Sequence, residues 1–233
     1  MTRLDHLVWA VPELEPAVDQ LREQWGCTVL PGGRHPRWGT WNALVPLRSR
    51  SYLEIIAPHP EPPVSGGRVF DLDALREPRL VTWAVRPRER PGGMTAPSPA
   101  EVSGGLGTLV ERVRKAGVEL GEVSRGARRT ADGRRLEWFL SDPFATRLGG
   151  VVPFLIAWGE TPHPSGDGPS EVVLRSLELF HPDPAAVEGA LLALGQKETI
   201  PVREASEPRL LALLDTPRGT VELGAEPRWE GRR

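Results

Sequence analysis

The sequence predicts an α+β fold built from repeated βαβββ units, with mixed sheets and with the helices on the outside. The main observation is that a strand, an amphipathic helix and three further strands follow one another three times along the chain. The motif Trp-Ala-Val at residues 9–11 also returns at residues 83–85, near the start of the second copy. Segments rich in proline and glycine at residues 59–78 and 159–170 separate the three copies.

The first unit spans residues 4–57. Strand alternation in residues 4–11 places His6 on the same face as Val8 and Ala10, opposite Leu7 and Trp9. Residues 12–25 carry apolar side chains at helical spacing, and Gly26 ends this helix. We expect a short strand at residues 27–30, a loop at 31–36, and strands at 40–47 and 52–57.

The second and third units repeat this order. In residues 79–158 we expect a strand at 80–85, a helix around 106–113, and strands at 121–130, 136–140 and 151–158. The charged segment 86–99 between strand and helix is predicted to be mobile. The third unit, residues 171–226, begins with a strand at 172–180 and a helix capped by Asp183 with Pro184 at its first position. Strands at 198–203, 210–214 and 220–224 follow, and residues 227–233 form a polar tail.

Composition excludes several classes of partner. The chain has 233 residues, of which 39% are hydrophobic, so it can bury a substantial core. Its net charge of −2 gives no basic footprint for nucleic acid. No apolar run approaches membrane-spanning length and no signal peptide is apparent, so we expect a cytoplasmic protein with no membrane partner. The single cysteine, Cys27, excludes an internal disulfide.

Two polar side chains interrupt strands that are otherwise apolar. His6 lies in the first strand, and Glu54 shares a strand face with Tyr52 and Ile56. A carboxylate buried alone is costly, so Glu54 requires a partner. The two side chains either form a structural pair or hold a divalent metal ion, and both interpretations stay open. Without a metal, Glu54 can still act as a general base, because burial raises the pKa of a carboxyl group.

The segment from Gly32 to Asn42 is the richest in chemically useful side chains. Arg34 offers an anion clamp, His35 a second imidazole and Trp38 an aromatic wall, while Thr40 and Asn42 share one strand face. The alternative is a solvent-exposed turn without a function. Two further histidines, His59 and His163, lie in proline-rich linkers and are predicted to be solvated.

Several stretches of the first unit together resemble the glyoxalase-like domains of the vicinal oxygen chelate superfamily. They are residues 4–11, Gly32-Gly-Arg-His35, Gly39-Thr-Trp-Asn-Ala-Leu44 and Tyr52-Leu-Glu-Ile-Ile56, and the resemblance extends over residues 4–226. In that superfamily two units curl their sheets around a central cup, with metal ligands from the first and last strand of each unit. The resemblance implies a glyoxalase-like domain at residues 1–158, a linker at 159–170, and the third unit packed on that domain.

The resemblance also implies a site. His6 and Glu54 would hold a divalent ion, Mn, Fe, Ni or Zn, with Glu222 of the third unit as a third ligand. Ser176 stands where the third unit would repeat His6, and the second unit offers only Leu80 or Thr82 and Phe154. Glu54 and His35 would be catalytic, and the substrate would contact Arg34, Trp38, Thr40, Asn42 and Tyr52.

Two functions follow from this resemblance. The first is a metal-dependent lyase, isomerase or dioxygenase that acts on a small oxygenated metabolite. The alternative is a metal-free protein that binds a small molecule, as resistance proteins of this superfamily do, and Ser176 in place of a histidine favours it. In either case the expected partner is a small molecule, and the protein is expected to be a monomer or a homodimer.

Overall fold

The computed structural model describes residues 1–64, 66–88, 98–130, 133–196 and 200–224. Most of the segment 86–99, predicted to be mobile, lies outside these residues, and so does the polar tail at 227–233. Within the described ranges, no helix is both long enough and apolar enough to cross a lipid bilayer.

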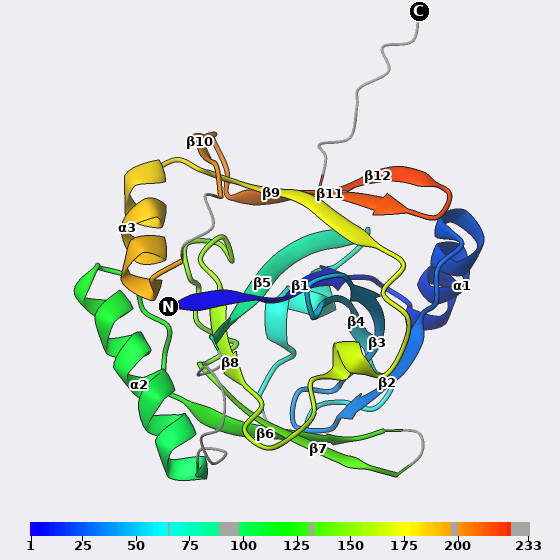
Figure 1. The fold of residues 1–233 in the computed structure, drawn as a ribbon, viewed down its shortest axis with the longest axis horizontal. Coiled ribbons are helices and arrows are strands. Elements are labelled where there is room, and N and C mark those ends of the chain that lie inside the picture. The colour runs from blue at the N-terminus through cyan, green and yellow to red at the C-terminus, as the bar shows by residue number, and fades with distance from the viewer. Residues whose placement is uncertain (65, 89–97, 131–132, 197–199, 225–233) are drawn as a thin grey trace, which may run out of the picture.

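The first two units share one curled sheet of eight strands (Figure 1). Its strands are β1 (Thr2–Ala10), β2 (Leu30–His35), β3 (Thr40–Leu47), β4 (Ser51–Pro58), β5 (Arg79–Pro87), β6 (Ser124–Arg129), β7 (Arg135–Leu140) and β8 (Phe154–Ala157), in the order β2-β3-β4-β1-β5-β8-β7-β6. In each unit the first strand pairs in parallel with the last, β1 with β4 and β5 with β8. The antiparallel pair β1 and β5 joins the halves, so the predicted shared sheet is confirmed.

The two faces of this sheet have separate hydrophobic clusters. Val8 and Ala10 belong to the cluster on the inner face, which we call the cup, whereas Leu7 and Trp9 belong to the larger cluster on the outer face. The helices α1 (Leu14–Trp25) and α2 (Pro99–Lys115) bury their apolar stripes in that outer cluster. The alternation predicted for the first strand is therefore confirmed, with the helices outside.

The cup closes where β2 approaches β6, the two ends of the strand order. Residues 31–35 of the segment predicted to be a loop, 31–36, belong to β2, and no strand forms at residues 27–29. The prediction was wrong because Pro31, Gly32 and Gly33 resemble turn residues, although proline and glycine also suit an edge strand or a bulge. A Cβ on Gly33 would lie 2.4 Å from the backbone oxygen of Arg129 in β6. Glycine is therefore what allows the two strands to meet.

The third unit has the predicted element order but a different topology. It consists of β9 (Val173–His181), α3 (Pro184–Leu194), β10 (Val202–Glu204), β11 (Arg209–Thr216) and β12 (Gly219–Leu223), in the sheet order β10-β9-β11-β12. The side chain of Asp183 caps α3, as predicted. In the first unit the last strand lies beside the first, but β12 lies at the sheet edge, separated from β9 by β11. Matching β12 to β4 by sequence order was therefore wrong.

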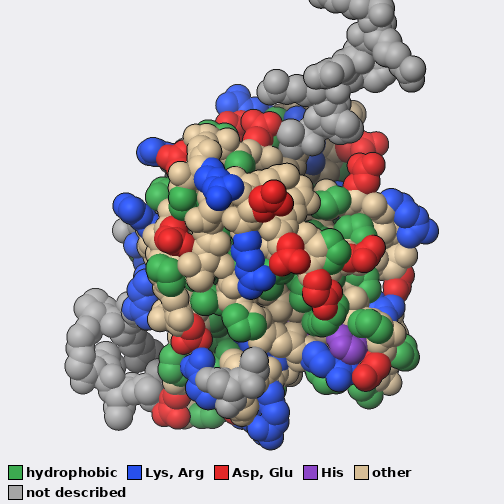
Figure 2. Space-filling view, turned by 90° about the vertical axis from the view of Figure 1, so that its right-hand side faces the viewer, with side chains coloured by type: hydrophobic (Ala, Val, Ile, Leu, Met, Phe, Trp, Pro, Cys, Tyr) green, Lys and Arg blue, Asp and Glu red, His purple; other side chains and the backbone are tan. Residues whose placement is uncertain are grey.

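This second sheet covers the outer face of the eight-stranded sheet. Leu179, Leu210 and Ala212 share the outer hydrophobic cluster with Leu7 and Trp83 of the central strands. Figure 1 shows α3 beside α2, and the β11–β12 end of the sheet near α1. On the face seen in Figure 2, acidic and basic side chains are interspersed instead of forming one basic patch. The third unit thus stabilises the sheet from behind and leaves the cup to the first two units.

The linkers include two short 3-10 helices, η1 (Val69–Ala74) and η2 (Pro164–Gly166). Val69 and Leu72 of η1 are buried in the inner cluster. The segment around η2 contacts β3 and β4. Both predicted surface linkers therefore place residues against the cup.

The seam between β2 and β6 gives a testable prediction. Gly33→Ala should lower the free energy of unfolding by about 1–3 kcal/mol, because the new methyl group meets backbone that cannot rotate away. Gly104→Ala is the matched control, since an added Cβ there meets nothing within 4 Å and Gly104 lies inside α2. It should raise that free energy by about 0.5–1 kcal/mol. Urea denaturation of both variants and of wild type measures the free energies of unfolding. Equal changes in the two variants would contradict the close approach between β2 and β6 at Gly33.

Candidate functional site

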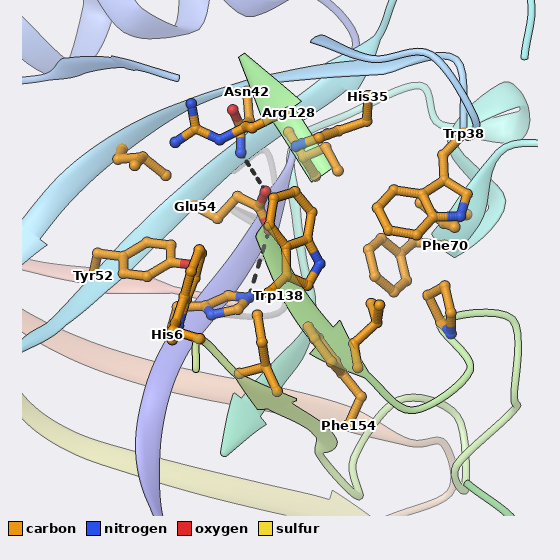
Figure 3. Close-up of a pocket in the computed structure, with 17 residues that line it drawn as sticks. His6, His35, Trp38, Asn42, Tyr52, Glu54, Phe70, Arg128, Trp138 and Phe154 are labelled. Atoms are coloured by element: carbon orange, nitrogen blue, oxygen red, sulfur yellow. Dashed lines mark hydrogen bonds and ion pairs between the residues drawn. The ribbon is translucent and has the colours of Figure 1, made fainter. Parts of the chain in front are cut away.

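A cavity opens inside the cup between the two halves of the sheet (Figure 3). Most of its wall is aromatic or aliphatic, with a small polar group at one side. The lining residues are His6, His35, Trp38, Asn42, Leu44, Tyr52, Glu54, Ile56, Val69, Phe70, Arg128, Trp138, Leu140, Pro143, Phe154, Ile156 and Trp158. Its volume, measured as the space open to the centre of a water molecule, is about 50 Å³. That space suits a few waters or a small organic molecule.

His6 and Glu54 meet in this cavity because β1 and β4 are parallel neighbours. His6 pairs with Tyr52 and Val8 with Glu54, so Glu54 lies one step further along the same face. The His6 Nε2 and Glu54 Oε2 atoms are 3.6 Å apart. The His6 ring is buried and stacks on Tyr52 with ring centroids 4.6 Å apart. The predicted proximity of these two side chains is therefore present in the structure.

Asn42 positions the Glu54 carboxylate. Its side-chain nitrogen donates to Glu54 Oε1 at 2.6 Å, and its side-chain oxygen accepts from the backbone N–H of Gly33 at 3.0 Å. Both ends of the amide are thus occupied, which fixes its orientation.

Asp5, which the sequence analysis did not select, orients His6 from behind. Asp5 Oδ1 lies 2.7 Å from His6 Nδ1. Strand alternation would place neighbours on opposite faces, but the pairing of β1 with β5 shifts register between Leu4 and His6, which leaves Asp5 as an extra, bulged residue. The bulge turns the Asp5 carboxylate toward the His6 ring. His6 therefore presents Nε2 to the cavity.

The Asp5 carboxylate is fully buried and has three further partners. Its Oδ2 accepts from Arg86 Nη1 at 2.9 Å, from Trp158 Nε1 at 3.2 Å and from His163 Nε2 at 3.2 Å. Burial raises the pKa of Asp5, but hydrogen bonds from His163 and His6 outweigh it and hold that pKa far below its usual range. Asp5 is therefore an ionised acceptor, and its partners supply the hydrogens, including the one on His6 Nδ1.

His163 contradicts its predicted solvation. Its side chain is 7% exposed and reaches Asp5 from the linker that contains η2. His163 Nδ1 accepts from the backbone N–H of Ser165 at 3.3 Å, which leaves the hydrogen on Nε2. Burial lowers the pKa of His163 although Asp5 acts in the opposite direction. The contact between His163 and Asp5 thus holds the linker against β1, next to His6.

His35 lines the cavity as a neutral imidazole. It is 5% exposed, its Nδ1 lies 3.1 Å from Thr40 Oγ1, and its ring meets the edges or faces of Trp38 and Trp138. Burial, with a smaller effect of the Arg128 charge, lowers the pKa of His35 to about 3. Thr40 is fully buried and acts behind His35 instead of lining the cavity.

The cavity's arginine is Arg128, which the sequence analysis missed. Arg34, the predicted anion clamp, is exposed, pairs with Glu61 and lies outside the cavity. Neighbouring residues of a strand point to opposite faces, so Arg34 points outward while His35 points into the cup. In β6 the residues that alternate inward are Gly126 and Arg128, and Arg128 is 6% exposed. Alternation in residues 124–129 was the available signal for this residue.

Glu222 also lies outside the site. It is exposed on β12, in the four-stranded sheet on the far side of β1 and β5 from the cup. The predicted equivalence with Glu54 assumed that β12 lies beside β9, which the topology contradicts. Glu222 is therefore removed from the candidate ligands.

The remaining donors do not fit a resident divalent ion. Catalytic zinc sites, for example, use three protein ligands. Among the described residues no three His, Cys, Asp or Glu side chains group closely enough to hold a metal. Burial and the carboxylates of Asp5 and Glu54 raise the pKa of Tyr52 well above 10, so its phenol stays protonated. The second half of the sheet supplies the cavity with apolar side chains and the Arg128 cation instead of ligands.

Comparison with known proteins identifies the fold. A sequence profile described as a glyoxalase-like domain matches residues 4–195. No curated protein matches significantly. A hypothetical protein from Staphylococcus aureus is 14% identical, with a TM-score of 0.56 over 90% of this chain and 88% of that chain. Methylmalonyl-CoA epimerase from Mycobacterium tuberculosis is 21% identical, with a TM-score of 0.38 over 66% of this chain and 84% of that chain. These structural likenesses concern the fold alone.

The neutral His35 predicts loss of stability in mild acid. An unfolded histidine binds a proton below a pH of about 6.5, but folded His35 does so only near pH 3. Proton uptake by the unfolded state therefore lowers the free energy of unfolding as pH falls, by about 1.4 kcal/mol per pH unit. Between pH 6.5 and 5.0, wild type should lose about 2 kcal/mol more than His35→Gln. Urea denaturation at both pH values measures this, and parallel losses would contradict the assignment.

Proposed function

Because the chain belongs to the glyoxalase-like domain family of the vicinal oxygen chelate superfamily, we propose that it is an enzyme that moves a proton on a small oxygenated metabolite. The cavity between the first two units is the proposed active site. Glu54 is the proposed general base, and His6 is its acid-base partner. This reaction class corresponds to the isomerase and lyase branches of the functions that the resemblance implies.

The observation that carries this proposal is the chain of contacts Asp5–His6–Glu54 at the wall of an otherwise apolar cavity. Asp5 accepts the Nδ1 hydrogen of His6, which leaves Nε2 free to exchange a proton at the cavity surface. The 3.6 Å between Nε2 and Glu54 Oε2 lets these two groups serve the same small substrate. A carboxylate supporting an imidazole is a common arrangement for acid-base catalysis.

The proposed step is the removal of a proton from a carbon next to a carbonyl group. The proton moves to Glu54, and the electron pair of the C–H bond moves into the carbonyl to give an enolate. The neutral His35 and the protonated phenol of Tyr52 are the hydrogen-bonding groups that would stabilise the enolate oxygen. Delivery of the proton to a neighbouring carbon completes an isomerisation, either from Glu54 directly or from His6 after Nε2 has taken the proton from Glu54. Departure of an anionic leaving group from the next carbon completes an elimination instead.

The remaining predicted contacts take supporting roles. Trp38 supplies part of the aromatic wall, and Asn42 holds the Glu54 carboxylate while also lining the cavity. Apolar walls strengthen the electrostatic interactions between the substrate and these groups. The cytoplasmic location and the monomeric or dimeric state stay predictions.

The second candidate is a protein that binds a small molecule without turning it over. The aromatic rings of Trp38, Phe70, Trp138, Phe154 and Trp158 around the cavity favour it, since such walls suit capture of a flat apolar ligand. This candidate gives Glu54 no chemical role, so substitution of Glu54 separates the two functions.

Glu54→Gln is the decisive variant. Small 2-oxo and 2-hydroxy acids and their amides, incubated with the protein in D₂O, report carbon-bound hydrogen exchange by proton NMR. We expect wild-type exchange with at least one of these compounds, and a loss of roughly 100-fold or more in Glu54→Gln. The melting temperature should stay level or rise, because a buried charge has been removed. Glu111→Gln, on the exposed face of α2, is the matched control and should behave as wild type.

The opposite pattern would contradict the enzyme proposal. A Glu54→Gln protein that melts at a lower temperature but exchanges hydrogen at the wild-type rate would assign Glu54 to a structural pair with His6. Binding without any exchange in wild type would favour the second candidate.

A further prediction concerns metal content. The superfamily resemblance implies Mn, Fe, Ni or Zn, but in the described part of the chain His6 and Glu54 converge without a third His, Cys, Asp or Glu close enough to complete a metal site. Protein purified without a chelator and without a metal-binding tag should contain much less than one divalent ion per chain by elemental analysis. One equivalent of metal in wild type that disappears in His6→Ala would overturn this expectation and restore the metal-dependent mechanism.

A further inference from the structure

Arg128 is a buried cation that the carboxylates of Glu54 and Asp167 stabilise only from a distance. Its side chain is 6% exposed, and its guanidinium forms no hydrogen bond or ion pair with any residue in the described part of the chain. Its Nη1 is inaccessible to solvent and lacks an acceptor. Burying a charge in this state is unfavourable unless a counter-ion compensates it. By contrast, the buried carboxylate of Asp5 is compensated by both Arg86 and His163.

The position of Arg128 is fixed by the closure of the sheet. It extends inward from β6 at the seam with β2, where a Cβ on Gly33 would lie 3.2 Å from Nη1. Arg128 and Asn42 line the cavity and also a larger groove on the outer side, between α1, β2 and β6. Arg128 therefore lies between the cavity and the outer groove.

We propose that Arg128 binds the carboxylate of the substrate, which makes small 2-oxo or 2-hydroxy monocarboxylic acids the substrate class. This inference rests on the proposed function of the cavity. The planar guanidinium matches a carboxylate through two parallel hydrogen bonds. Arg128 is the only lysine or arginine among the cavity-lining residues, all of which are described. One fixed positive charge suits a monoanion better than a phosphate dianion, which requires more donors.

The arrangement of the other side chains gives the bound acid a direction. In Figure 3, Arg128 and Asn42 lie on one side of Glu54, while Trp38, Phe70 and Phe154 lie on the other. A carboxylate held by Arg128 would therefore direct the rest of the molecule past Glu54 toward the aromatic wall. In a 2-hydroxy acid the carbon next to the carboxylate would then lie closest to Glu54, and Glu54 would remove its hydrogen. In a 2-oxo acid that carbon carries no hydrogen, so Glu54 would remove a hydrogen from the following carbon, which is also next to the keto group.

Calorimetric titration with matched acids and amides tests this inference. The probes are lactate and mandelate, each beside its neutral amide, which has the same shape. Wild type should bind at least one acid about 10- to 100-fold more tightly than its amide, the factor expected for charge-assisted hydrogen bonds. Arg128→Met should remove this preference. Arg128→Lys, which keeps the charge but not the planar fork, should retain part of it.

Two further variants control the experiment. Arg125→Met changes an exposed arginine of the same strand that pairs with Glu137, and it should leave the preference unchanged. Glu54→Gln should strengthen acid binding, because a negative charge near the bound carboxylate has been removed, even though it abolishes hydrogen exchange. Arg128→Met should melt at or above the wild-type temperature, since the substitution removes a buried charge whose Nη1 lacks a hydrogen-bond acceptor among the described residues.

The outcomes separate this inference from the proposed function. Equal affinity of wild type for acids and amides, absence of binding by any probe, or an unchanged preference in Arg128→Met would overturn the assignment of Arg128. A lower melting temperature of Arg128→Met with unchanged binding would assign it to the structure of the seam. Acid binding that depends on Arg128 without hydrogen exchange would support this inference while contradicting the proposed enzyme.

Discussion

The buried carboxylate of Asp5 holds together the parts of the chain that form the cavity. Its donors come from four places: His6 in β1, Arg86 in β5, Trp158 after β8 and His163 in the linker. Both halves of the sheet and the linker therefore meet at one charge. Removing one member of a buried ion pair of this kind costs about 3–5 kcal/mol, because the other charge is left uncompensated. The same carboxylate also fixes which nitrogen of His6 faces the cavity.

The two halves of the sheet are alike in topology but differ in chemistry. The first half supplies His6, Asn42, Tyr52 and Glu54, which hold, donate or accept protons. The second half supplies Arg128 and a wall of aromatic and aliphatic side chains. A symmetric distribution of donors would surround a metal ion, whereas this one places His6 and Glu54 opposite an aromatic wall with one cation, Arg128. This difference is what the proposed proton transfer by side chains depends on.

Much of the architecture could be predicted from the sequence because periodicity depends on local burial. The alternation in β1 and β4 located His6 and Glu54 correctly, and the repeat of elements identified the two halves of the sheet. The third unit was misinterpreted because element order does not determine strand order, and Glu222 was lost for that reason. β2 was missed because its glycines serve a close approach between distant strands, which a local pattern does not reveal.

Three residues at or beside the cavity, Asp5, His163 and Arg128, were not predicted, each for a different physical reason. Asp5 reaches His6 only through a bulge, and alternation predicts the opposite face for it. His163 belongs to a linker whose composition is that of a solvated segment, and its burial depends on contacts with Asp5, Tyr52 and Trp158 that local composition does not reveal. The inward position of Arg128 could have been predicted from strand alternation, because Gly126 and Arg128 alternate with exposed neighbours. Arg34 was preferred because it lies beside His35 in sequence, although adjacent residues of a strand point in opposite directions.

The most direct test of whether Asp5 orients His6 toward Glu54 is to determine which nitrogen of the His6 ring carries the hydrogen. If Asp5 orients His6 as proposed, Nδ1 carries the hydrogen donated to Asp5, and Nε2 faces Glu54. Nitrogen-15 NMR of ring-labelled histidine at neutral pH, with the signal assigned by its loss in His6→Gln, reports which nitrogen is protonated. We predict a protonated Nδ1 that is protected from solvent exchange, and an Nε2 signal that shifts in Glu54→Gln. An unprotonated Nδ1, with the hydrogen on Nε2 alone, would contradict the account.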